Sequence, residues 1–78
     1  MDSPAEAARV PVADDAIRLG QFLKLSGLAD SGAEARALLE DGDVTVNGEP
    51  ETRRGRQLRR GDEVVVAAPG GPLRAVVA

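Results

Sequence analysis

Five arginines stand close together in the second half of the chain, in a stretch of eight residues that contains no acid. They are Arg53, Arg54, Arg56, Arg59 and Arg60. A guanidinium group binds phosphate through two parallel hydrogen bonds, so this cluster predicts binding to the phosphates of a nucleic acid. Runs of charge also occur on plain solvated surfaces. The alternative is that Arg59 and Arg60 only solvate a turn and that the other three pair with Glu49, Glu51 and Asp62.

The remaining polar residues offer little catalytic chemistry. The chain has no cysteine and no histidine, which excludes thiolate and imidazole metal sites and Cys- or His-based catalysis. Glu40 and Asp41 are adjacent, so they point in different directions from a helix. Neither a nucleophile-base pair nor a Walker-type phosphate loop is present. The sequence therefore predicts no enzyme activity, no cofactor, no metal ion and no small-molecule substrate.

Charge is distributed unevenly along the chain. The net charge is −3 and the sequence pI is about 4.8, which taken alone argues against a nucleic-acid partner. Residues 1–16 hold four acids and one arginine, and so account for the whole net charge. Because salt screens charges over about 8–10 Å, a phosphate near the arginines responds mainly to them. We expect a flexible acidic tail over residues 1–15 and a single domain over residues 16–78.

One stretch in the middle of the chain contains the start and stop signals of a helix, followed by a strand and a turn. Ser31 and Glu34 form the S-x-x-E capping box that begins a helix. Gly42 can adopt the left-handed conformation that ends it. The Val-Thr-Val run that follows alternates as a strand does, and Asn47-Gly48 is the strongest short hairpin signal. The expected core-facing stripe of this helix is Ala35, Leu38 and Leu39.

The elements around that stretch complete an α+β pattern. Leu19, Phe22 and Leu23 have helical spacing and predict an earlier helix that ends near Gly27, with a possible short strand at residues 16–19 before it. The connection to the second helix is short, so the two helices should pack as neighbours. Pro50 lacks an N–H and restricts its segment to an edge strand or a loop. We expect two packed helices followed by a small, mainly antiparallel sheet.

These features together resemble the S4 RNA-binding module with its αL motif, over about fifty residues from Ile17 to Val66. The matching pieces are Gly27-Leu28, Ser31 to Leu39, Gly42-Asp43-Val44-Thr45-Val46-Asn47-Gly48 and Gly61-Asp62. The chain is most similar to the small free-standing bacterial S4-like RNA-binding proteins. The residues that carry this closer similarity are Leu23-Lys24, Ser31-Gly32 and Glu51-Thr52-Arg53.

The resemblance implies a non-catalytic protein that docks a basic surface on the phosphates of a structured RNA, either rRNA or tRNA. In that family the second helix, the loop before it and the following turn face the RNA. The candidate contacts by this correspondence are Arg18, Lys24, Ser31, Gly32, Arg36, Asn47 and Gly48. The arginine cluster adds Arg53, Arg54, Arg56, Arg59 and Arg60.

The chain departs from the wider family at four positions where many S4 modules carry a cation. These positions hold Gly32, Ala33, Asp43 and Glu49. We therefore expect a weaker RNA-binding surface that has moved toward residues 53–60. Phe22 is the one aromatic residue and has the spacing of a core residue, so bases have no aromatic platform on which to stack. Folded RNA read by shape and phosphates is the better expectation.

Two other functions fit parts of the sequence. A protein-interaction module could use the sheet edge near Pro50 or the strand expected at Leu73–Val77. A β-grasp carrier would end in Gly-Gly, but seven residues follow Gly71, and the twelve residues between Glu49 and Asp62 are too few for the helix of that fold. The N-terminus lacks an apolar signal region and no apolar run could span a bilayer, so we expect a soluble, cytoplasmic monomer that does not bind a membrane.

Overall fold

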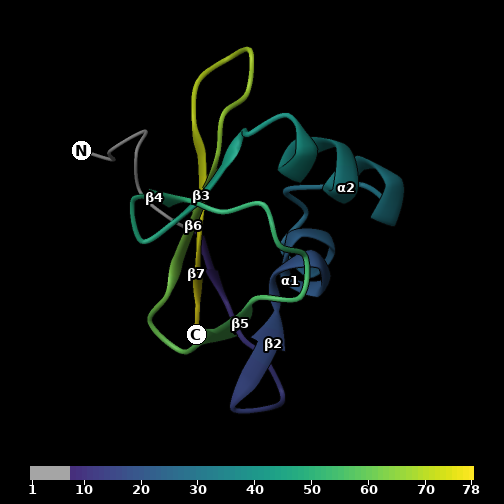
Figure 1. Cartoon of the computed structure of the whole chain (residues 1–78). Coiled ribbons are helices and arrows are strands. Elements are labelled where there is room, and N and C mark those ends of the chain that lie inside the picture. Colours follow the sequence, from purple (N-terminus) through teal and green to yellow (C-terminus); the bar gives the residue numbers. More distant parts are fainter. Residues whose placement is uncertain (1–7) are drawn as a thin grey trace, which may run out of the picture.

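The computed structural model describes residues 8–78 of the chain, which form two helices and seven strands (Figure 1). The elements in chain order are β1 (Ala8–Val10), β2 (Ala16–Arg18), α1 (Leu19–Leu25), α2 (Gly32–Glu40), β3 (Val44–Val46), β4 (Glu49–Pro50), β5 (Gln57–Arg59), β6 (Glu63–Val66) and β7 (Leu73–Val77). Among these residues no helix is long and apolar enough to cross a membrane.

The strands form two sheets. The larger one has five strands in the order β1-β7-β6-β3-β4, and the smaller one pairs β2 with β5 in antiparallel fashion. Within the larger sheet β3, β4, β6 and β7 pair antiparallel, whereas β1 lies parallel to β7, with Arg9 opposite Val76. Figure 1 shows this sheet beside the helix pair, with the β2–β5 ribbon below α1.

The α+β class is confirmed, but the predicted layout differs from the structure in one respect. Strands flank the helices, because β1 as well as the strand raised at residues 16–19 precedes them. The pairings are mainly antiparallel as expected, with β1 parallel to β7 as the exception. The boundary expected at residue 16 also differs from the structure. Residues 1–7 of the expected tail lie outside the described residues, while Ala8–Val10 forms β1. The backbone of Ala78 donates to the carbonyl of Val10, which extends this edge pairing by one residue.

The second helix begins and ends as the sequence predicts. The Ser31 side chain accepts a hydrogen bond from the Glu34 N–H at 3.1 Å and so caps one of the unpaired first-turn donors. The Glu34 carboxylate reaches back to the N–H of Asp30 at 3.0 Å, one residue before the position that a capping box requires. Gly42 has a φ of +78°, the left-handed conformation expected just beyond a helix end.

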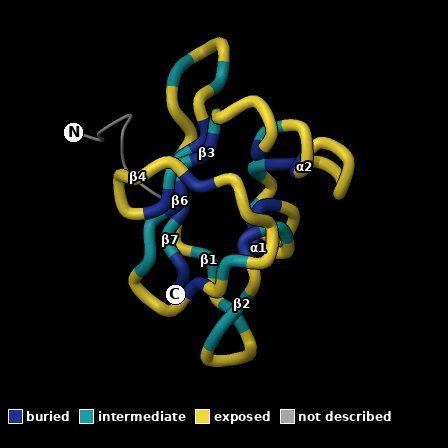
Figure 2. The backbone as a smooth tube through the Cα atoms, viewed as in Figure 1, coloured by how far each residue is buried: buried dark blue, intermediate teal, exposed yellow. Residues whose placement is uncertain are grey.

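The core lies between the helix pair and the inner face of the larger sheet. Alternate strand residues are buried, so Val44 and Val46 of β3 and Val64 and Val66 of β6 belong to the core. Figure 2 shows the buried segments of these strands in dark blue. Phe22 is fully buried in α1, as predicted, and Leu58 of β5 joins the same cluster. Of the stripe expected on α2, Ala35 and Leu39 are buried while Leu38 is only half-buried. Residues 51–56 join β4 to β5 and carry three of the five arginines, and we call them the arginine segment. This segment runs from the larger sheet to the strand that holds the buried Leu58.

Candidate nucleic-acid interface

The segment that joins β4 to β5 is held against the first turn of α1. The backbone N–H groups of Leu19 and Gly20 donate to the carbonyls of Arg56 and Arg54, at 2.8 and 3.0 Å. The first N–H groups of a helix have no partner within the helix, so the segment satisfies donors that would otherwise need water. Arg54 lies in van der Waals range of Gly20, since a Cβ there would be 3.5 Å from the Arg54 Cβ. The arginines are thus fixed beside the helix pair.

A second contact fixes the same segment from the side. The Arg18 guanidinium donates from Nη1 to the carbonyl of Gly55 at 3.3 Å. A side chain at position 55 would crowd that guanidinium, because its Cβ would lie 3.3 Å from Nη1. Arg18 therefore contributes to the shape of the surface as well as to its charge.

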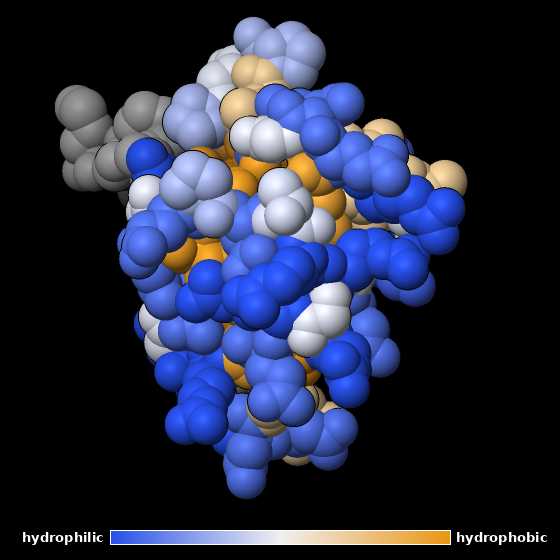
Figure 3. Space-filling view, viewed as in Figure 1, coloured by the Kyte–Doolittle hydropathy of each residue, from blue (hydrophilic) through white to orange (hydrophobic). Residues whose placement is uncertain are grey.

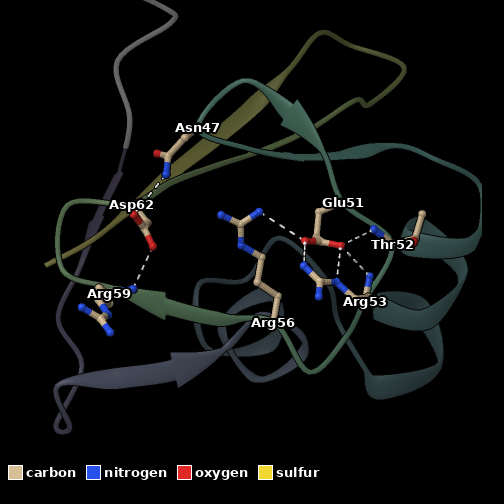
Figure 4. Close-up of polar contacts among 7 residues, drawn as sticks. All are labelled: Asn47, Glu51, Thr52, Arg53, Arg56, Arg59 and Asp62. Atoms are coloured by element: carbon tan, nitrogen blue, oxygen red, sulfur yellow. Dashed lines mark hydrogen bonds and ion pairs between the residues drawn. The ribbon is translucent and has the colours of Figure 1, made fainter.

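Glu51 organises the start of the arginine segment and is 7% exposed (Figure 4). Its carboxylate accepts hydrogen bonds from the backbone N–H groups of Thr52 and Arg53 at 2.9 and 3.0 Å. It also accepts bonds from the Arg53 guanidinium and from Nη1 of Arg56, between 3.1 and 3.2 Å. The Arg53 side chain is the largest of the causes that lower the Glu51 pKa from 4.5 to about 2. The carboxylate is therefore ionised and fully bonded.

The pairing with Glu51 divides the arginines into different roles. The Arg53 side chain is 75% exposed despite its ion pair, so it can still reach a phosphate. The Arg56 side chain is 32% exposed and its guanidinium lies against the same carboxylate, so its role is chiefly structural. The alternative of acid pairing is thus correct for these two side chains. The sequence named Glu51 as one of three possible partners, but nothing around it distinguishes it from the exposed Glu49.

A groove of about 300 Å³ lies between α1, the first turn of α2 and the arginine segment. The residues that line it are Arg18, Gly20, Gln21, Lys24, Gly32, Ala35, Arg54 and Gly55. We call this the cationic groove, because it brings together three cations that make no ion pair with any acid in residues 8–78. In Figure 3 strongly hydrophilic side chains gather across the middle of the face that carries the β4–β5 segment. Four predicted site residues, Arg18, Lys24, Gly32 and Arg54, meet here.

Arg59 and Arg60 do not line the cationic groove. Gln57–Arg59 forms β5, so a strand separates Arg59 and Arg60 from the other three arginines. The Arg60 guanidinium instead bonds Asp15 at 2.9 Å and the carbonyl of Val12 at 3.4 Å, both in the β1–β2 connection. Of the five arginines, only Arg54 therefore lines the cationic groove.

Asn47 and Gly48 form a turn that is tied to the next connection. Both have positive φ, +51° and +85°, as the hairpin between β3 and β4 requires. The Asn47 amide donates to Asp62 at 3.1 Å and its oxygen accepts from the N–H of Glu63 at 2.9 Å (Figure 4). Asp62 also accepts from the N–H of Arg59 at 2.8 Å. Asn47 therefore joins two turns and lies outside the cationic groove.

The two remaining predicted residues are on α2. Ser31 caps the helix beside Gly32, at the end that borders the cationic groove. Arg36 is exposed on α2 and makes no ion pair with the acids of residues 8–78. Neither side chain lines the groove. The described part of the chain holds no group of three or more carboxylates that could bind a metal ion.

Comparison with known proteins identifies the family of this chain. A model of the S4 domain family matches residues 10–73, which include the helix pair, the hairpin turn and the arginine segment. A Bacillus subtilis (strain 168) protein named "Probable ribosome maturation protein RlbA" is 44% identical over 57 residues, or 73% of this chain and 80% of that protein. The family match spans the residues whose resemblance to S4 modules the sequence indicated. The chain belongs to the S4 domain family.

Proposed function

We propose that this protein binds a structured RNA, without catalysis, by placing the cationic groove and the neighbouring Arg53 on its phosphates. The observation that carries the proposal is the meeting of Arg18, Lys24 and Arg54 from three separate elements in one open groove. Arginine and lysine side chains that lack an acidic partner are the usual contacts to RNA phosphates.

The overall negative charge does not oppose this function. Part of the acidic charge is already paired with cations, as in Asp15 with Arg60 and Glu51 with Arg53. Exposed charges farther away than a Debye length, about 8 Å at physiological salt, are largely screened. A phosphate in the cationic groove would therefore respond chiefly to the three cations around it.

Ribosomal RNA is the RNA that we propose as the partner, with tRNA as the second candidate. The support is the name of the Bacillus subtilis relative, which refers to ribosome maturation. A folded RNA also fits a surface whose one aromatic residue, Phe22, is fully buried and cannot stack on a base.

A fluorescence-anisotropy titration tests the proposal with three labelled probes, a structured rRNA fragment, a single-stranded RNA and a duplex DNA. We expect the structured RNA to bind most tightly. With three to five phosphate contacts the logarithm of the association constant should fall with the logarithm of salt concentration with a slope of about −2 to −4. A slope near zero would contradict phosphate binding. Absence of binding to all three probes at low salt would transfer the function to a protein partner.

A further inference from the structure

We propose that the cationic groove holds one unpaired nucleotide of the RNA, with its phosphate on the cations and its base inside the groove. This inference rests on the proposed function and specifies the RNA feature that it recognises. The first observation is size. The volume of the groove, about 300 Å³, lies at the lower end of the range for pockets that bind a small organic molecule. This volume is larger than that of a single phosphate group.

The second observation is that glycines create the space. Three of the lining residues are glycines. A Cβ at Gly55 would lie 3.3 Å from Nη1 of Arg18, a tight contact, whereas a Cβ at Gly20 would make only ordinary contacts with Arg54. A Cβ at Gly32 would meet nothing within 4 Å. Gly32 also has an ordinary helical φ, so the turn does not require a glycine. The missing side chain at position 32 therefore serves to leave the groove open.

The third observation is the chemistry of the walls. Arg54 lines the groove and packs its Cβ and Cγ beside Gly20, at 3.5 and 3.7 Å from an ideal Cβ there. Unstacked RNA bases stack on arginine planes as well as on aromatic rings, so the lack of an exposed aromatic does not exclude a base. Gln21 adds an amide that can donate to a base edge while its oxygen accepts from the Arg18 N–H at 3.4 Å. A nucleotide thus finds partners for its phosphate and for its base.

The test compares three hairpin RNAs that share one stem: a perfect stem, a stem with one bulged adenosine, and a stem whose bulged nucleotide is abasic. The abasic probe keeps the extra phosphate and the distorted backbone but lacks the base. We expect wild-type protein to bind the bulged adenosine at least about fivefold more tightly than the abasic probe, the lower end of what base stacking contributes. Equal affinity for these two probes would overturn the inference.

Gly32→Leu places a side chain in the groove, and Ala33→Leu adds the same side chain to the neighbouring exposed residue, which does not line the groove. Gly32→Leu should reduce the ratio of the affinities for the bulged adenosine and the abasic probe to below about twofold, whatever its effect on the perfect stem. Ala33→Leu should keep the preference. Thermal unfolding of both variants establishes that they are folded, and an equal loss of preference in both would count against the groove.

Two further outcomes distinguish failure of the nucleotide site from failure of the proposed RNA-binding function. If no hairpin binds in a salt-sensitive way, the proposed function itself fails. If all three hairpins bind tightly and equally, RNA binding stands and the nucleotide site is rejected. Adenosine 5′-monophosphate is titrated alone to test binding of a free nucleotide. If it saturates the protein at the same concentrations as the bulged hairpin, the ligand of the groove is a free nucleotide and the inference is wrong.

Discussion

The Glu51 carboxylate and the Arg53 guanidinium are joined by two hydrogen bonds, Nε to Oε1 at 3.2 Å and Nη2 to Oε2 at 3.1 Å. The carboxylate is nearly buried, whereas the Arg53 side chain is largely exposed. A buried acid therefore fixes the direction of an exposed cation. This preorganisation lowers the side-chain entropy that Arg53 would lose on meeting a phosphate, at the cost of part of its charge.

Glu51 should make the stability of the protein depend on acid pH. Its folded-state pKa of about 2 lies below the ordinary 4.5, so folding favours the ionised form. The stabilisation is fully present above pH 4.5 and is lost as the pH falls toward 2. Glu51→Gln should lower the free energy of unfolding at pH 6 by about 1–3 kcal/mol and flatten its decline toward pH 3, as measured by urea titrations at both values.

Glu49→Gln is the matched control for that experiment, because Glu49 is exposed and makes no ion pair with the cations of residues 8–78. It should leave the unfolding free energy nearly unchanged at both pH values. If Glu51→Gln and Glu49→Gln gave the same acid profile, the role assigned to Glu51 would be wrong.

Leu39 and Leu38 should differ in their contribution to stability although they are adjacent on α2. Leu39 is 1% exposed and belongs to the core cluster, whereas Leu38 is half-buried at its edge. Leu39→Ala should cost about 2–5 kcal/mol, and Leu38→Ala clearly less, because only the former leaves an enclosed cavity. Denaturant unfolding of the two variants checks the order, and a larger loss for Leu38→Ala would contradict the packing.

Asn47 should stabilise the fold by its side-chain bonds more than by its backbone conformation. Asn47→Ala removes the bonds to Asp62 and Glu63 and also strains the positive φ, whereas Asn47→Gly removes the bonds alone. We expect a loss of about 1–3 kcal/mol for the glycine variant and a larger loss for the alanine variant, measured by thermal unfolding. A glycine variant as stable as the wild type would show that these bonds contribute nothing.

The parts of the fold that depend on neighbouring residues were predictable from the sequence. The Ser31 cap, the glycine beyond α2 and the Asn47-Gly48 turn each follow from a backbone requirement within a few residues, and the structure shows all three. The strand β1 was not predictable in this way. It pairs with β7 near the other end of the chain, and a three-residue strand carries no periodic signal of its own.

In the candidate site, too, the features set by residue type were predictable and those set by contacts between distant segments were not. Arg18, Lys24, Gly32 and Arg54 could be singled out by residue type and family resemblance, and the structure brings them into one groove. The burial of Glu51 and the pairing of Arg60 with Asp15 depend on contacts between distant segments, so a local charge count treated all five arginines alike. Charge density along a chain therefore identified the segment but not the side chains free to bind.

The most direct test of the central claim measures the salt dependence of binding to a structured rRNA fragment for Arg54→Gln and Arg60→Gln. Arg54 lines the cationic groove, whereas Arg60 is held by Asp15 away from it. Arg54→Gln should weaken binding and make the salt slope shallower by about 1, the value for one lost phosphate contact, while Arg60→Gln should leave both unchanged. A loss of affinity and slope in Arg60→Gln but not in Arg54→Gln would contradict the assignment of the cationic groove as the RNA-binding surface.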